Sequence, residues 1–170
     1  MKLIEGLKTP EQRMRNMNDI IQDKKLSIDQ YRTAVMTLEE DMKKIPGAMI
    51  GDCCPLAHSF ADGCCIREIF LPAGMILVTK IHKKNHPYFI MKGDVSVMTE
   101  DGFVRLRGPY HGITKAGTKR IIYVNEDTIW ITVHVTNEKD IKKIEDEVIA
   151  KTFEELERKE NVKEIIDQDL

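Results

Sequence analysis

The stretch GMILVTKIHKKNHPYFIMKG, residues 74–93, decides the fold of this chain. Apolar and β-branched residues flank His82 and His86, and Gly74 and Gly93 bound the segment. Such short apolar runs between glycines are typical of strands joined by tight turns. Short apolar runs separated by turn residues continue on both sides of this stretch, and together they predict seven strands. They cover residues 64–71, 75–82, 87–92, 94–99, 103–107, 119–124 and 128–135.

One pair of these strands carries a specific turn signal. Asp101-Gly102 separates the β-rich runs 95–99 and 103–106, and this dipeptide favours an antiparallel hairpin. Several short strands spaced this closely predict an all-β sandwich or barrel. We expect the β domain to cover residues 47–137.

A helical arm is predicted before the β domain, over residues 1–46. Thr9-Pro10 is expected to begin a first, short helix, and Ser27 with Gln30 forms a capping box for a second. The second helix carries one apolar stripe made of Ile28, Tyr31, Val35, Leu38, Met42 and Ile45. A stripe of this kind must be buried. It packs either on the chain's own strands or on a partner subunit.

A second helical region is predicted over residues 138–170. Asn137 is the expected N-cap of a helix, and Ile141, Ile144 and Val148 lie on one face of that helix. The last stretch, from Phe153 onward, is rich in acidic residues. We expect it to form an acidic tail.

The composition excludes several classes of protein. The chain has 170 residues with 26 basic and 28 acidic side chains, a formal net charge of -2. It lacks the basic excess of a protein that binds a nucleic-acid polymer. Its longest run without a polar side chain, 69–78, is far shorter than the roughly 20 residues of a membrane span. Charged side chains are spread through the first 13 residues, which leaves no apolar signal-peptide region there, so we expect a cytoplasmic protein and not a secreted one.

The cysteines form two adjacent pairs, Cys53-Cys54 and Cys64-Cys65. Zinc sites usually separate the cysteines of a pair by two or more residues, and a cytoplasmic location favours reduced thiols. We therefore predict free thiols. Cys64 and Cys65 are expected on opposite faces of a strand, with one of them buried.

The pattern Gly74-x5-Lys80-x-His82-x3-His86-x6-Gly93 resembles the first motif of the cupin superfamily. In metal-binding cupins this motif supplies two histidines and a carboxylate. By this resemblance Lys80 stands at the first histidine, His82 is the second, and His86 stands at the carboxylate. The resemblance implies a mainly β fold: a single small barrel of the double-stranded β-helix, or jelly-roll, type, with the helical arm and the C-terminal helix at its flanks.

The stretch 115–120, KAGTKR, resembles the second cupin motif. Gly117 is kept, whereas Lys115 stands at the motif's proline and Arg120 at its histidine. The resemblance also extends to small cupin-like proteins common in tailed-phage genomes. It runs through Pro72, Lys80-Ile81-His82-Lys83, His86-Pro87, Lys92-Gly93, Thr99-Glu100-Asp101-Gly102, Ala116-Gly117-Thr118-Lys119-Arg120, Trp130 and His134. It implies a phage protein acting in the host cytoplasm, and it supplies no catalytic residues.

Lysine and arginine at two ligand positions place fixed positive charge where a cation would otherwise bind. We therefore expect no cofactor and a non-catalytic pocket for an anionic small molecule such as a nucleotide. In a phage such a pocket fits a sponge that sequesters a nucleotide immune signal of the host. The expected ligand-binding residues are Lys80, His82, His86, Arg105, Arg107, Tyr110, His111, Lys119, Arg120, Trp130 and His134.

Other interpretations stay open at this stage. His134 shares a strand face with Trp130, so His82, His86 and His134 form an alternative site for a divalent transition metal in a cupin-type enzyme. A phage structural or assembly protein is a third possibility. The amphipathic arm favours a homo-oligomer in each case. The lysines near the motifs have a simpler interpretation as solvated charges that block edge aggregation: Lys83, Lys84, Lys92 and Lys119.

Overall fold

The computed structural model describes residues 19, 27–49, 51 and 54–156 of the chain. The predicted first helix, Cys53 and the end of the acidic tail lie outside these residues. In chain order the elements are α2 (Ile28–Lys43), β1 (Leu56–Ala61), β2 (Cys64–Leu71), β3 (Ile76–Val78), β4 (Ile81–His82), β5 (His86–Thr99), β6 (Gly102–Arg107), β7 (Tyr110–Thr114), β8 (Ile121–Val135), α3 (Ile141–Val148) and β9 (Ile149–Ala150).

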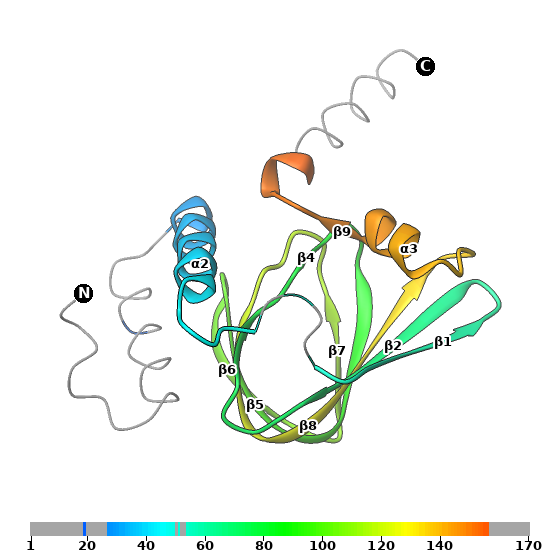
Figure 1. The fold of residues 1–170 in the computed structure, drawn as a ribbon, viewed down its shortest axis with the longest axis horizontal. Coiled ribbons are helices and arrows are strands. Elements are labelled where there is room, and N and C mark those ends of the chain that lie inside the picture. The colour runs from blue at the N-terminus through cyan, green and yellow to red at the C-terminus, as the bar shows by residue number, and fades with distance from the viewer. Residues whose placement is uncertain (1–18, 20–26, 50, 52–53, 157–170) are drawn as a thin grey trace, which may run out of the picture.

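Two long antiparallel strands, β5 and β8, organise the sheet. The strand order is β1-β2-β8-β5-β6, with β3 also paired to β8 and β7 also paired to β5. Strand β5 pairs with β7 through residues 86–90 and with β6 through residues 94–99. Strand β8 likewise pairs with β3 near its start and with β2 through residues 128–135. Each of the two long strands therefore has one outer neighbour along its first half and a different one along its second half. The sheet curves strongly between these two halves (Figure 1).

The bend lies at Gly93. The pairing of β5 with β8 shifts register three times between Ile90 and Val95, and such bulges bend and twist a strand. Gly93 has a φ of 102°, and a Cβ atom there would lie 2.2 Å from Thr128 Oγ1. Only glycine fits this corner.

The mainly β, antiparallel architecture that we predicted is confirmed, and strand 64–71 has the predicted bounds. The predicted strands 87–92 and 94–99 are the two halves of β5, and 119–124 and 128–135 are the two halves of β8. Both pairs were separated in the prediction because a bulge interrupts the alternation. The prediction of one strand over residues 75–82 is wrong, because two separate strands, β3 and β4, lie there.

The hairpin prediction is also confirmed. Strands β5 and β6 pair from Thr99 and Gly102 outward, so the connecting loop is Glu100-Asp101. Gly102 has a φ of 113° and begins the second strand. The glycine therefore lies at the first position of β6, beside the loop and not within it.

Helix α2 packs on the chain's own sheet. Tyr31 and Val35 are buried against Met98 and Ile121, and the one hydrogen of the Tyr31 hydroxyl is shared between the carbonyl oxygens of Met98 and Lys119. The predicted capping box of Ser27 is present. The ends of the predicted stripe, Ile28 and Ile45, remain exposed.

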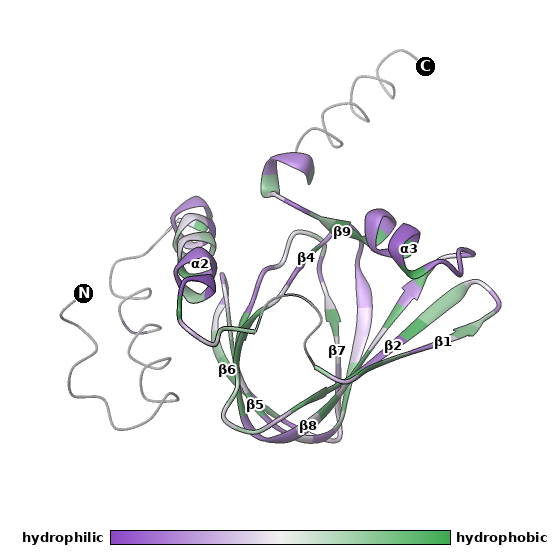
Figure 2. Cartoon of the chain, viewed as in Figure 1, coloured by the Kyte–Doolittle hydropathy of each residue, from purple (hydrophilic) through white to green (hydrophobic). Residues whose placement is uncertain are grey.

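Helix α3 lies at the end of the main sheet that is nearest to the separate β4–β9 pair (Figure 1). Ile144 and Val148 pack with Cys65, whereas the rest of the helix is mainly hydrophilic (Figure 2). Its N-cap is Asp140, which accepts hydrogen bonds from two backbone amides. The prediction of Asn137 as the cap is wrong, because the helix starts at Ile141, three residues later than a cap at Asn137 would place it.

Two smaller expectations can be compared with the structure. Cys65 is buried and Cys64 is half-buried on the same strand, and both are free thiols, as predicted. No helix within the described part of the chain is long and apolar enough to cross a bilayer.

Candidate functional site

A cavity of about 840 Å³ lies on the concave side of the sheet. Residues of β2, β3 and β8 line it, and residues 45–49 of the connection after α2 line it as well. Five of the sequence-predicted site residues line this cavity. They are Lys80, His82, His86, Arg120 and Trp130.

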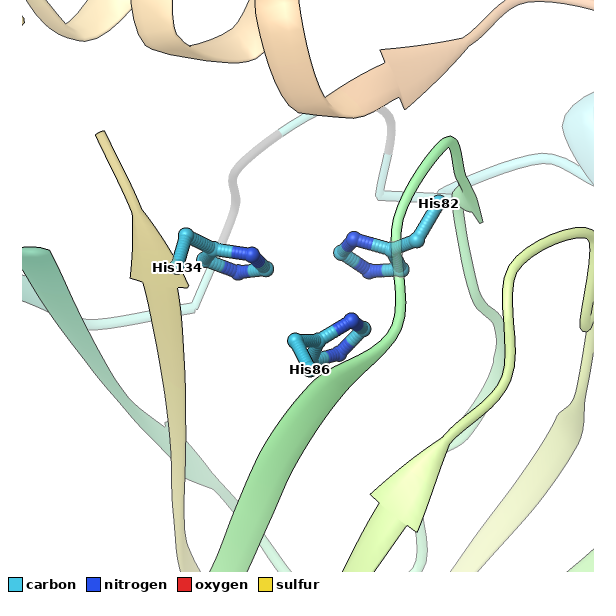
Figure 3. Close-up of side chains that lie close together, drawn as sticks. All are labelled: His82, His86 and His134. Carbon is cyan, nitrogen blue, oxygen red and sulfur yellow. The ribbon is translucent and has the colours of Figure 1, made fainter.

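Three histidines lie close together (Figure 3), and two of them, His82 and His86, line one end of the cavity. The ring centroids are 4.1 Å apart for His82 and His86, 4.6 Å for His86 and His134, and 5.2 Å for His82 and His134. One ring nitrogen of each histidine lies within 4.8 Å of those of the other two. The structure thus brings together the trio that the sequence indicated as the alternative metal site.

Each histidine comes from a different strand. His82 lies on β4, His86 begins β5, and His134 lies near the end of β8. Strand β4 is held on both sides, because it pairs with β9 and because the carbonyl oxygen of His82 accepts a hydrogen bond from Gly117 N. The C-terminal segment therefore fixes the backbone of one member of the cluster (Figure 3).

Hydrogen bonds also orient two of the imidazoles. His86 Nδ1 lies 3.3 Å from the carbonyl oxygen of Lys84, which can only accept, so this nitrogen carries the proton and Nε2 has the free lone pair. His134 Nε2 lies 3.1 Å from Thr132 Oγ1. His82 Nδ1 is buried and has no hydrogen-bond partner among the described residues. A buried imidazole nitrogen without a hydrogen-bond partner is available to bind a metal ion or another ligand.

Burial keeps all three histidines neutral. Removal from water, together with the charges of the neighbouring histidines and arginines, lowers the pKa of His82 to about 2. Burial likewise lowers the pKa of His134 to about 4 and lowers that of His86. Neutral imidazole is the form that binds metal ions. The cluster is therefore in its metal-binding protonation state at neutral pH.

Two arginines flank the histidines. Arg120 Cζ lies 4.9 Å from the ring centroid of Tyr88, and no described carboxylate forms an ion pair with this guanidinium. Arg67 lines the same end of the cavity, and its charge lowers the pKa values of His82 and His134. Two permanent positive charges thus face the polar end of the cavity.

Lys80 lies at the edge of this end of the cavity. Its Nζ donates a 2.7 Å hydrogen bond to Glu145 Oε1 on α3, so part of its charge is offset by a neighbouring carboxylate. A second cavity of about 20 Å³ lies between α3 and His82 and His134. It is large enough for about one water molecule.

The structure does not bring three of the expected cations to the cavity. Arg105 Nε and Arg107 Nε bind opposite oxygens of the buried Asp94 carboxylate. Lys119 is 4% exposed and its Nζ lies 2.8 Å from Glu39 Oε2. The interpretation of Lys119 as a solvated charge is therefore wrong, because the lysine anchors α2 to the sheet.

The expected aromatic residues are divided between the cavity and the surface. Trp130 lines the cavity and stacks on Tyr88, with centroids 4.9 Å apart. Tyr110 and His111 are exposed on β7. His111 contacts the Phe89 ring from there.

Two residues of the site were not predicted. Arg67 shares one face of β2 with Cys65, Ile69 and Leu71, and this alternation within the strand 64–71 was the signal for an inward-facing arginine. Thr114 lies beside His86 in the sheet, and its buried Oγ1 has no hydrogen-bond partner in the described part of the chain. It lies on β7, which the strand prediction omitted.

No protein-family model matches this sequence, and no curated protein matches it. The solved structures similar to it include the ectoine synthase of P. lautus, at 8% identity and a TM-score of 0.47, over 64% of this chain and 83% of that chain. A cupin-2 domain protein from Shewanella frigidimarina has 7% identity and a TM-score of 0.42, over 48% and 80%. A cupin superfamily protein from Desulfitobacterium hafniense has 11% identity and a TM-score of 0.41, over 49% and 79%. Each similarity is weak, and proteins of the cupin superfamily are among the structures found.

Proposed function

We propose that this chain binds an anionic small molecule in its cavity and holds a divalent transition-metal ion with His82, His86 and His134. The observation that carries the proposal is the convergence of three neutral imidazoles at the cationic end of a cavity of about 840 Å³. Cavities of roughly 300–1,000 Å³ are typical of small-molecule sites.

The donor set fits a borderline metal ion. Imidazole suits zinc, iron, copper and nickel, and the three donor atoms are already within 4.8 Å of one another. The bond from His86 Nδ1 to a backbone carbonyl oxygen is the outer contact that metal-binding histidines usually make. The vacant His82 Nδ1 has no other partner among the described residues.

The charges around the cluster fit an anionic organic partner. Arg67 and Arg120 raise the electrostatic potential at this end of the cavity, which disfavours a metal ion alone and favours one accompanied by an anion. Carboxylate and phosphate groups both match a guanidinium. The arginines therefore attract the anion, and the bound anion offsets the repulsion that a metal cation would meet.

The residues around the cluster support binding better than hydrolysis. A metal ion bound there would supply a Lewis acid, but a general base is also needed to move a proton. Glu39 lines the cavity and pairs with Lys119, and Glu145 lines the small cavity beside His82 and His134 and pairs with Lys80. We therefore propose a binding protein first and a metal-dependent enzyme second.

Metal content and native mass test this proposal in one preparation. We expect one zinc, iron, copper or nickel ion per chain in protein purified without chelators, and its loss in His82→Ala and His134→Ala. His111→Ala is the matched control, because this histidine is exposed on β7, and it is expected to keep the metal. Absence of metal from the unmodified protein after reconstitution would exclude the metal site. Native mass spectra of the same preparation also report whether the chain forms a homo-oligomer, which we propose as well.

One observation favours a second, metal-free function. Arg120, Tyr88 and Trp130 form a continuous cationic and aromatic stack, a combination that binds phosphate groups and rings. This stack supports the proposal of a phage sponge for a nucleotide immune signal. A panel of cyclic and ADP-ribose-derived nucleotides tests it by thermal shift, and a panel without any shift contradicts it.

A further inference from the structure

We propose that the ligand of the cavity is an amphipathic carboxylate. Its carboxylate lies between Arg67 and Arg120 beside the histidine cluster, and its apolar body extends along β2 and β8 toward Leu71. This inference rests on the proposed anion-binding function and names the chemical class of the anion.

The polarity of the cavity changes in one direction along β2. Successive inward-facing residues of this strand are Arg67, Ile69 and Leu71, and all three line the cavity. Leu71 is 2% exposed and belongs to the main apolar core. The cationic group is therefore at one end of the strand and the aliphatic groups are at the other.

Strand β8 shows the same gradient in register with β2. Its inward-facing residues run from His134 through Thr132 to Trp130. Thr132 pairs with Arg67 and Trp130 pairs with Ile69. Two neighbouring walls therefore change from polar to apolar at the same level of the cavity.

Neighbouring residues complete each end. Met75, Leu77 and Ile122 line the apolar part, and Met75 and Leu77 pack against the main core. At the polar end, Thr114 Oγ1 and His82 Nδ1 are both buried without a hydrogen-bond partner among the described residues. A carboxylate accepts a hydrogen bond from a threonine hydroxyl, so it would satisfy the first of these atoms.

The dimensions fit a ligand with a body of moderate length. Arg67 and Leu71 are four residues apart on one strand, which corresponds to roughly 13 Å. A nucleotide would place its ribose and base against the aliphatic, thioether and indole groups of this region. Burial of those polar groups without partners costs free energy, whereas an alkyl chain or phenyl ring gains free energy there.

Trp130 provides a direct measurement, since it is the only tryptophan of the chain. We would titrate octanoate, acetate, 1-octanol and AMP into the metal-loaded, full-length protein and follow its fluorescence, with calorimetry to give the affinities. Octanoate is expected to bind one molecule per chain and to change the Trp130 emission. Its affinity is expected to exceed those of acetate, octanol and AMP by about tenfold or more, because only octanoate has both the charge and the apolar body.

Two variants separate the ends of the site. Arg120→Gln is expected to weaken octanoate by about tenfold and to leave octanol unchanged, since it removes a charged partner of the carboxylate. Leu77→Gln is expected to weaken both, because it removes apolar contact with the body. Lys142→Gln, an exposed change on α3, is the control and is expected to keep both affinities.

The possible failures can be told apart. Tighter binding of AMP than of octanoate, or equal binding of octanol and octanoate, would overturn the inference. An unchanged octanoate affinity in Arg120→Gln would do the same. If the samples contain one metal ion per chain and still bind no octanoate, this inference alone is wrong. If they bind neither metal nor any of the anions, the proposed function is wrong as well.

Discussion

The imidazole rings of His82 and His134 stack with their centroids 5.2 Å apart and their planes inclined by 10°. Two imidazolium ions could not share this buried position, because their charges would repel each other with little screening by water. The strand pairing of β4 with β9 and of β8 with β2 holds both residues there. The fold therefore imposes neutrality on the pair, and this has consequences for stability, binding and design.

The first consequence is sensitivity to acid. The ordinary histidine pKa is 6.5, whereas it is about 2 for His82 and about 4 for His134 in the folded chain. Below pH 6.5 the unfolded chain binds protons that the folded chain does not, so stability falls as the pH is lowered. At pH 5 the loss is about 2 kcal/mol for each of the two histidines. Urea unfolding of chelator-treated protein between pH 7.5 and 5 measures this loss.

A variant shows whether the histidines cause the acid effect. His82→Gln is expected to remove about 2 kcal/mol of the loss between pH 7.5 and 5, because glutamine does not titrate. An unfolding free energy that is flat over this range in the unmodified chain would contradict the prediction.

Arg120 is expected to reduce stability. Its guanidinium lies in the cavity against the Tyr88 ring and has no ion pair with a described carboxylate, so its removal from water is poorly compensated. Arg120→Met is expected to leave the unfolding free energy unchanged or to raise it by about 1 kcal/mol, while octanoate binding weakens by about tenfold. Denaturant unfolding and calorimetry on the same variant measure both. A loss of several kcal/mol would instead show that this arginine serves the fold.

The ion pair of Lys119 and Glu39 is expected to stabilise the docking of α2. Lys119 is 4% exposed, and its Nζ also donates a hydrogen bond to the carbonyl oxygen of Thr79. Lys119→Met leaves Glu39 half-buried without this partner, at an expected cost of about 3 kcal/mol. Thermal and urea unfolding measure it. Lys44→Met, which removes an exposed pair, is the control and is expected to cost less than about 1 kcal/mol.

Glycine at position 93 is expected to be irreplaceable, unlike glycine at position 74. Both have a positive φ, but an added Cβ at Gly93 would overlap Thr128, whereas at Gly74 nothing lies within 4 Å. Gly74→Ala is expected to cost about 1–2 kcal/mol from backbone strain alone. Gly93→Ala should cost several kcal/mol or prevent folding. Soluble yield and unfolding midpoints compare the two, and equal effects would contradict the assigned corner.

The sequence predicted the fold best where a short-range rule decides the structure. The capping box of Ser27 and the Asp101-Gly102 turn both act within a few residues, and both are present in the structure. The prediction was weaker at Gly93, where the bulge divides one strand into two apparent ones. Strand β9 and its partner β4 were beyond a pattern rule, because a strand of two residues has no period to detect.

The sequence likewise predicted one part of the candidate site and not another. The spacing of His82 and His86 and the strand face of His134 already named the trio that the structure brings together. The same reasoning could not separate Arg120, which lines the cavity, from Arg105 and Arg107, which bind Asp94. All three are arginines within or next to predicted strands, and sequence alone does not show which face of the curved sheet each one occupies.

The sequence by itself determined the antiparallel β architecture, the two described helices and the identity of the histidine trio, since alternation, capping and spacing act locally along the chain. Only the tertiary structure decided which cations face the cavity, that Arg67 is one of them, and that Lys119 anchors α2. These outcomes depend on the bend of β5 and β8 and on the packing of residues far apart in sequence, and the free energy of such contacts is not encoded in any single stretch.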